Sequence, residues 1–161
     1  MRHYFFDSST FLKLFVVEEG GSRVRAIVRV AQAENTRIKV SICDLAHPEC
    51  VSALRQLLER GAGGRRGISS ATLRRTLPEV ASMTSRGSVF SVVPASEVMR
   101  QAADLALRHQ LKGADCVHMA AAEQVRQRLA DGEEFWFVSA DVRQAAAARR
   151  EGMPVLDPTA A

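Results

Sequence analysis

Four acidic residues stand where short apolar segments give way to sequence with helical spacing. Asp7 follows Tyr4-Phe5-Phe6, Glu49 lies behind Val40-Ser41-Ile42, Asp115 ends Gly113-Ala114-Asp115, and Asp141 follows Phe137-Val138-Ser139. In an open α/β sheet the carboxyl ends of parallel strands share one edge, so acids far apart in sequence can meet there. Mutually repelling carboxylates would be costly at that edge unless a cation neutralised them. The sequence therefore predicts that Asp7, Glu49, Asp115 and Asp141 bind metal and carry catalysis.

A site made of carboxylates suits Mg²⁺ or Mn²⁺, which take oxygen ligands and keep several bound waters. One ion, or two ions roughly 3.5–4 Å apart, would polarise a phosphodiester, lower the pKa of an attacking water and stabilise the leaving oxygen. This chemistry requires no histidine base. The sequence leaves the number of ions open.

Each acid also has a purely structural interpretation. Asp7, Asp115 and Asp141 are each placed to cap a helix, as Asp often does. Glu49 lies one turn into its helix, where the helix dipole favours a carboxylate whether or not it binds a ligand. Each acid alone is weak support for a site, and the set of four at similar junctions favours the metal interpretation.

Small polar residues beside the acids have two interpretations as well. Ser8, Ser9 and Ser139 could hold metal-bound waters or, equally, cap helices. His118 lies one helical turn beyond Asp115, and Cys116 is close by. We expect His118 to pack in the interior or to hydrogen-bond a metal ligand.

Five predicted strands alternate with helices along the chain. The alternation predicts an α/β fold with a central parallel sheet, right-handed crossovers and flanking helices. The expected strands cover residues 3–6, 38–42, 89–93, 135–139 and 153–156. The expected helices cover residues 8–17, 23–33, 44–61, 115–129 and 142–150. Two more helices are expected: one begins at residue 69 or 70, is disturbed at Pro78 and ends by residue 87, and the other is capped by Ser96.

The length of 161 residues fits one domain, covering residues 1–161. The Gly- and Arg-rich stretch 61–67 is predicted to be a loop within that domain, because too little sequence precedes it for a separate one. No apolar run approaches the roughly 20 residues of a membrane span. Asp7 interrupts the apolar start where a secretory signal would continue, so we expect a soluble, cytoplasmic chain.

The cysteine content and the charge give two further expectations. Cys43, Cys50 and Cys116 are an odd number without CxxC spacing, which argues against a disulfide framework or a zinc site and favours buried thiols. A formal charge of +4 favours an anionic partner such as nucleic acid. The excess of arginine over lysine suits phosphate, but the base composition of the source genome explains that ratio better.

Four segments in order resemble the PIN-domain ribonucleases, and within them the VapC-like toxins of type II toxin–antitoxin pairs. The opening YFFDSSTFLKLFVVEEG is similar to the first strand, metal-binding Asp and helix of that family. HPECVSALRQLLERG is similar to its second motif, LKGADCVHMAAAEQ to its third and FWFVSADVRQAAAARREGMPVLDP to its fourth. The chain departs from the family at Pro48, which precedes Glu49, and in the Gly- and Arg-rich segment between Leu58 and Leu73.

The resemblance implies a PIN fold and an endoribonuclease that uses Mg²⁺ or Mn²⁺ at Asp7, Glu49, Asp115 and Asp141. It implies RNA as substrate, products with a 5′-phosphate and a 3′-hydroxyl, a homodimer, and inhibition by a cognate antitoxin protein. Phe11, Leu12, Phe15 and Val16 form an apolar helical face that would serve a dimer or, alternatively, the core. Arg143 is the arginine best placed to contact RNA phosphate, while Arg149 and Arg150 are expected to be surface charges.

Two other functions compete with this one. A phosphoacceptor signalling domain also places Asp residues at strand ends, but it needs a lysine near the late strands, and no lysine follows Lys112. A PIN fold retained as a non-catalytic RNA- or protein-binding module is the remaining alternative. Metal-dependent cleavage of RNA separates it from the ribonuclease.

Overall fold

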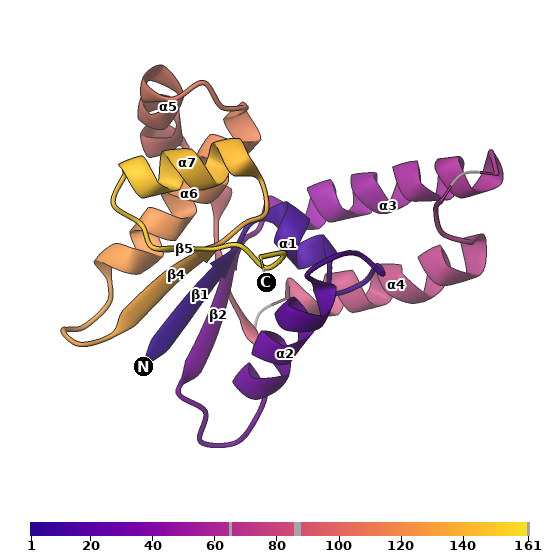
Figure 1. Cartoon of the computed structure of the whole chain (residues 1–161), viewed down its shortest axis with the longest axis horizontal. Helices are drawn as coiled ribbons and strands as arrows, with labels where there is room; N and C mark the ends of the chain where they lie inside the picture. The colour runs from indigo at the N-terminus through magenta and orange to yellow at the C-terminus, as the bar shows by residue number, and fades with distance from the viewer. Residues whose placement is uncertain (65, 86–87, 161) are drawn as a thin grey trace.

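Parallel strands form one central sheet in the computed structural model, which describes residues 1–64, 66–85 and 88–160 (Figure 1). The spatial order is β3-β2-β1-β4-β5, and every pair of neighbours is parallel. The order reverses at β1, so β1 and β4 lie side by side where the two windings of the sheet diverge. The strands are β1 Arg2–Phe6, β2 Ile38–Cys43, β3 Phe90–Val93, β4 Glu134–Val138 and β5 Val155–Leu156.

Helices cover both faces of the sheet, because its strands are apolar on both sides. On β1, Phe5 packs on one face, whereas Tyr4 and Phe6 pack on the other. Three helices pack on the Phe5 face: α5 Met99–Arg108, α6 Gly113–Gln127 and α7 Val142–Arg150. Four helices pack on the opposite face: α1 Ser8–Leu12, α2 Gly21–Ala31, α3 Ala46–Ala62 and α4 Ser70–Met83. The prediction of an α/β domain with a central parallel sheet is confirmed, and the arrangement is consistent with a PIN-like fold.

The first helix is shorter than predicted. It was expected to cover residues 8–17, but α1 ends at Leu12, and Leu14 and Phe15 then bond three residues back. Phe11 and Val16 are both buried against the same core. In a continuous α-helix these two residues would point about 140° apart. Tightening the chain after Leu12 lets both side chains reach that core.

The second helix starts two residues earlier than predicted, at Gly21. Its N-cap is Gly20, which has a φ of 78° and lies against the backbone of Pro158. A β-carbon at Gly20 would lie 2.7 Å from Pro158 O, so glycine is required there by both conformation and space. The two glycines therefore start α2.

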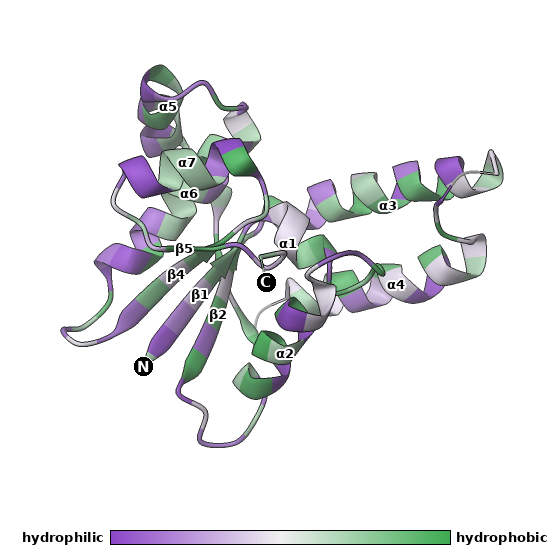
Figure 2. Ribbon diagram, in the orientation of Figure 1, coloured by the Kyte–Doolittle hydropathy of each residue, from purple (hydrophilic) through white to green (hydrophobic). Residues whose placement is uncertain are grey.

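Helices α3 and α4 form a hairpin that projects from the body of the molecule (Figure 1). Along both helices, hydrophobic and hydrophilic residues alternate (Figure 2). The turn brings Ile68 N within 3.2 Å of Leu57 O. A β-carbon at Gly67 would collide with Leu57 O and with the backbone of Gly61. The glycines of the predicted loop thus allow the close return of the chain.

The bounds of this hairpin differ in detail from the prediction. Helix α3 runs through Ala62, whereas the loop was expected to begin at Gly61. Helix α4 continues through Pro78 to Met83, so Pro78 does not end the helix. A proline removes a single backbone donor, and the rest of the helix remains bonded around it. Arg65 of the predicted loop and Gly87, the expected helix end, lie outside the described residues.

Later boundaries move by one or two residues, and one predicted cap is wrong. Ser96 lies inside a short 3₁₀ turn, η1 Ala95–Glu97, and α5 begins at Met99 without a side-chain cap. The turn follows directly from Pro94, whose carbonyl accepts from Glu97 N at 3.1 Å. The helix expected over 115–129 is α6, which covers Gly113–Gln127, and the strand expected over 135–139 is β4, which covers Glu134–Val138. The strand expected over 153–156 is shorter, because β5 covers only Val155–Leu156. Helix α7 has the predicted bounds.

All three cysteines are free and buried, as predicted. Burial raises the pKa of the Cys43 and Cys50 thiols to about 12, so both stay protonated near neutral pH. In the described parts of the chain, no helix is both long and apolar enough to cross a membrane.

Candidate active site

Asp7 is buried at the carboxyl end of β1 and caps α1. Its side chain is 2% exposed, and Oδ1 accepts from Thr10 N at 2.6 Å. Ser9 Oγ lies 3.0 Å from both carboxylate oxygens, and Ser139 Oγ donates to Oδ2 at 2.6 Å. The capping interpretation of Asp7 is therefore correct. These donors also fix the direction of the carboxylate at the edge of the sheet.

Asp141 joins the same edge through the pairing of β1 with β4. Phe6 pairs with Val138, so the next residues on the two strands, Asp7 and Ser139, lie side by side. The backbone N–H of Asp141 donates to Ser139 Oγ at 3.1 Å. Asp141 Oδ1 accepts from the first turn of α7, at 2.8 and 2.9 Å, so Asp141 caps that helix as expected.

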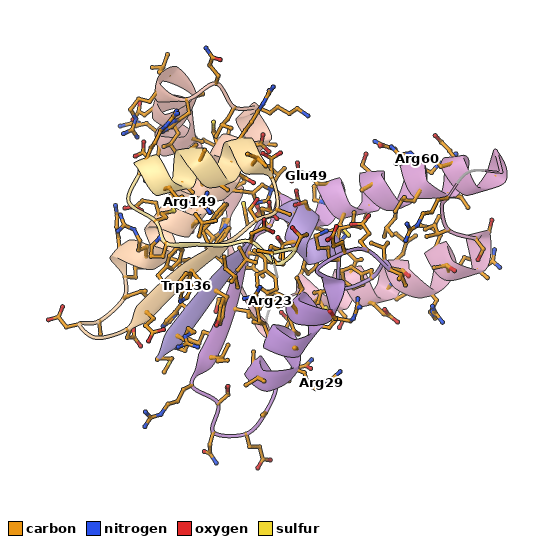
Figure 3. The ribbon with its side chains drawn as sticks, in the orientation of Figure 1. Arg23, Arg29, Glu49, Arg60, Trp136 and Arg149 are labelled. Atoms are coloured by element: carbon orange, nitrogen blue, oxygen red, sulfur yellow. The ribbon has the colours of Figure 1, made fainter. Side chains whose placement is uncertain are left out.

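Glu49 lies in the first turn of α3, at the base of the projecting hairpin (Figure 3). His118 Nε2, on α6, donates to Glu49 Oε2 at 2.6 Å, and the His118 side chain is 1% exposed. Burial raises the pKa of Glu49, but the hydrogen bond and charge of His118, with a contribution from Ser8, outweigh burial and hold the pKa below its usual range. His118 was expected either to pack in the interior or to hydrogen-bond a metal ligand, and it is both buried and bonded to a candidate ligand.

Asp115 lies in the first turn of α6 and does not cap it, because the N-cap position is Lys112. It also follows helix α5, whereas the other three acids follow a strand more directly. Burial raises the pKa of Asp115, and the negative charges of Asp141 and Glu49 raise it further, against the opposing effect of Lys112. Asp115 therefore lies where negative charge from two other acids accumulates.

Gln144 is a residue of this site that the sequence reasoning did not identify. It is 2% exposed, and its side chain connects three of the acidic segments. Its Nε2 donates to the carbonyl of Asp115 at 3.2 Å, and its Oε1 lies 3.2 Å from Ser139 Oγ, which itself bonds Asp7. The only signal for Gln144 in the sequence was a glutamine next to the run of alanines in α7.

The structure thus brings all four acids to the carboxyl edge of β1, β2 and β4. Hydrogen bonds connect the segments of Asp7, Asp141 and Asp115, and Glu49 is tied to the Asp115 helix through His118. Within the described residues, no three His, Cys, Asp or Glu side chains are arranged to hold one metal ion between them. The donors present are carboxylate oxygens, and the charges that raise the Asp115 pKa are those that a hard cation would neutralise.

The neighbouring thiol does not add a nucleophile to this site. Cys116 is buried, and burial together with the charge of Asp115 raises its pKa. A thiol with a raised pKa is protonated and unreactive.

Two cavities have none of the four acids in their lining. One, of about 710 Å³, lies between the segment after α1 and the α3–α4 hairpin, and its lining includes Phe15, Leu57 and Arg75. The other, of about 300 Å³, is lined by Arg143 and Arg150 of α7 and by the segment between α5 and α6. Both arginines are exposed and share this cavity; a surface position was expected of Arg150, whereas Arg143 was expected to contact RNA phosphate.

The chain has the overall fold of one protein of known structure, described as a toxin-antitoxin complex from Klebsiella pneumoniae. The TM-score is 0.57, and the match covers 96% of this chain and 97% of the other. Sequence identity is 15%, so the likeness is one of fold. No protein-family model matches the chain. No curated protein matches it either.

Proposed function

We propose that this chain is a metal-dependent endoribonuclease and the toxin of a toxin–antitoxin pair. The observation that carries the proposal is the position of four carboxylates at one edge of a parallel sheet, where burial and the charges of Asp141 and Glu49 raise the pKa of Asp115. Neighbouring carboxylates are unfavourable without a counter-charge, and carboxylate oxygens match the ligands of Mg²⁺ and Mn²⁺. The fold shared with a chain of a toxin-antitoxin complex supports the toxin role.

In this proposal Asp7, Glu49, Asp115 and Asp141 hold Mg²⁺ or Mn²⁺, which would activate a water and stabilise the leaving oxygen of an RNA phosphodiester. Mg²⁺ is commonly held by one or two carboxylates and several waters, so three preassembled protein ligands are not required. Ser9, Ser139 and the backbone of Thr10 orient Asp7.

The hydrogen bond from His118 lowers the pKa of Glu49 against the effect of burial and orients its carboxylate. Gln144 ties the Asp115 helix to Ser139. These bonds hold the carboxylates in place before any substrate arrives.

The decisive experiment is cleavage of a labelled single-stranded RNA by the purified chain, with Mg²⁺ or Mn²⁺ and with excess EDTA. Cleavage should require the metal and leave 5′-phosphate and 3′-hydroxyl ends. Asp115→Asn, expressed and purified in the same way, controls for contaminating nuclease. Undiminished cleavage in EDTA, or 2′,3′-cyclic phosphate ends, would overturn the proposal.

A non-catalytic binding module is the second candidate. It is favoured by one observation, namely that no three metal-binding side chains are preassembled in the described parts of the chain. The same RNA assay separates the two functions: RNA binding without cleavage at any metal concentration would select the binding module.

The toxin role implies an inhibitor that masks the acidic edge. An arginine or another cation from the antitoxin would neutralise the four acids as a metal does, and so compete with it directly. Expression of the chain alone should arrest growth, and co-expression of the neighbouring reading frame should restore it. Unrestrained growth with active protein in the cell would argue against the toxin role while leaving the nuclease untouched.

A further inference from the structure

The cavity of about 300 Å³ beside α7 has features of an anion site that the acidic edge does not explain. One wall is the outer face of α7, with Arg143 and Arg150. The other wall is the connection between α5 and α6, with His109 and Gln110. Arg143 and Arg150 are seven residues apart, so they lie on the same side of the helix. Between them the wall is formed by two alanines, Ala146 and Ala147, which leave room for a ligand.

Neither arginine has an acidic partner among the described residues. Arg143 and Arg150 take part in no ion pair there, in contrast to Arg108 and Arg126. Two unpaired guanidinium groups at one concave surface attract a multivalent oxyanion, and their planar donors suit phosphate in particular.

The acid next to Arg150 already has two partners. Glu151 directly follows Arg150, but its Oε1 accepts from His109 Nε2 at 2.6 Å and its Oε2 pairs with Arg108 at 3.1 Å. The His109 side chain is 6% exposed, so this arrangement is built into the protein rather than formed at the surface. The cavity therefore keeps the positive charge of both arginines.

The cavity adjoins the acidic edge directly. The backbone N–H of Arg143 donates to Asp141 Oδ1 at 2.8 Å, while its side chain lines the cavity. On the opposite wall, Leu111 precedes Asp115 by four residues. A polyanion that approached the four acids would be repelled by them, and a positive cavity next to Asp141 offsets that repulsion.

We propose that this cavity binds a backbone phosphate of the RNA strand next to the scissile one, with Arg143 and Arg150 as substrate-binding residues. The assignment rests on the proposed ribonuclease function for its choice of RNA. The chemistry itself requires only a phosphate group, which could also come from a free anion such as inorganic phosphate or a mononucleotide.

The test compares three glutamine variants on α7. Arg143→Gln and Arg150→Gln remove the two cavity arginines, and Arg149→Gln removes an exposed arginine of the same helix that does not line the cavity. All three change the net charge equally, so the last is a matched control. Because these side chains are exposed, the variants should keep the wild-type melting temperature, which thermal denaturation checks.

Binding is measured by fluorescence anisotropy of a short labelled single-stranded RNA in EDTA, over a range of salt concentrations. R143Q and R150Q should each raise Kd and lower the slope of log K against log salt by about 0.7, and the double variant R143Q/R150Q should raise Kd about tenfold or more. R149Q should stay within about twofold of the wild type. Equal weakening by R149Q and by R143Q would mean a diffuse surface charge and would overturn the proposal.

Two further arms identify the source of the phosphate and separate this inference from the proposed function. If inorganic phosphate or AMP binds the wild type but not the double variant, while RNA binding is unchanged, the cavity takes a free anion and the RNA assignment is overturned. In the cleavage assay with Mg²⁺, the double variant should raise KM and leave kcat nearly unchanged. A wild type that cleaves no RNA refutes the nuclease, whereas the difference in binding between R143Q/R150Q and R149Q would still stand.

Discussion

Asp7 and Asp115 lie at the same edge of the sheet in different electrostatic environments. Asp7 is surrounded by donors from Ser9, Thr10 and Ser139. Asp115 instead has a pKa raised by burial and by the charges of Asp141 and Glu49. The Asp7 carboxylate is therefore held by hydrogen bonds within the fold, whereas the folded structure disfavours the ionised form of Asp115.

The first prediction follows from this difference. Without metal at pH 7, Asp115→Asn should raise the melting temperature, because it removes a carboxylate whose ionisation the folded state disfavours. A raised pKa contributes stability that is present below the ordinary pKa of Asp, near 4, and is lost as the pH rises through the higher folded value. The advantage of the variant should therefore shrink as the pH falls towards 4. Thermal denaturation in EDTA at pH 7 and near pH 4 measures the difference in melting temperature between the variant and the wild type.

Asp7→Asn serves as the contrasting variant. It keeps one cap acceptor but replaces an oxygen that accepts from Ser9 and Ser139, so it should lower the free energy of unfolding by about 1–2 kcal/mol. Both variants should lose RNA cleavage. A fully active and folded Asp115→Asn protein would remove that residue from the site.

The second prediction concerns His118. Its bond to Glu49 orients a candidate ligand, and losing such a bond typically costs 10–100-fold in metal affinity or activity. His118→Leu should therefore lower cleavage at limiting Mg²⁺ by about that factor and recover in part at higher Mg²⁺, whereas His118→Gln, which can still donate, should lose less. His47→Gln is the control, because His47 bonds Thr84 and none of the acids. Equal activity of H118L and H47Q would exclude this role.

At the scale of elements, the α3–α4 hairpin depends on a close return of the chain. Gly67 passes so near Leu57 O and Gly61 that a β-carbon there has no space. Gly63, in the same turn, has a φ of −83°, and a β-carbon there would lie no closer than 3.5 Å to Arg60 O. A side chain is therefore excluded at Gly67 but has room at Gly63.

The third prediction uses this pair. Gly67→Ala should lower the free energy of unfolding by about 1–3 kcal/mol, because the added methyl group forces the two segments apart. Gly63→Ala should be neutral or slightly stabilising, since its backbone conformation suits alanine. Urea denaturation of both variants measures the difference. A Gly67→Ala protein as stable as the wild type would mean that the hairpin closes differently.

At the scale of the whole molecule, the apolar face considered for a dimer is largely occupied. Phe11 and Val16 are buried in the core, while Leu12 and Phe15 are only partly buried against it. The core interpretation of Phe11 is therefore correct, that of Phe15 holds only in part, and a dimer would have to use the remaining partly exposed residues. Val17, directly after this segment, is 84% exposed.

The fourth prediction is that the chain forms a homodimer in solution. Light scattering at micromolar concentration should give twice the mass of one chain. Val17→Asp should shift the population towards monomer if the surface after α1 takes part, because it places a charge in an apolar contact. A wild-type monomer would contradict this prediction.

The local sequence by itself determined the elements and their order. The alternation of short apolar segments with helical spacing was sufficient for the α/β class, and helix α7 matched its predicted bounds. The placement of Asp7 and Asp141 followed too, because a residue between a strand and a helix must lie at the carboxyl edge of the sheet. These features depend on neighbours only a few positions away.

Only the tertiary structure decided which side chains meet. The strand order places β1 beside β4, so that Asp7 bonds Ser139, and it brings His118 to Glu49 and Gln144 to Asp115. The end of α1 at Leu12 likewise reflects burial of Phe11 and Val16 in one core. Such contacts join residues far apart in the chain, where periodicity and spacing carry no information, because their partners are chosen by packing of the whole domain.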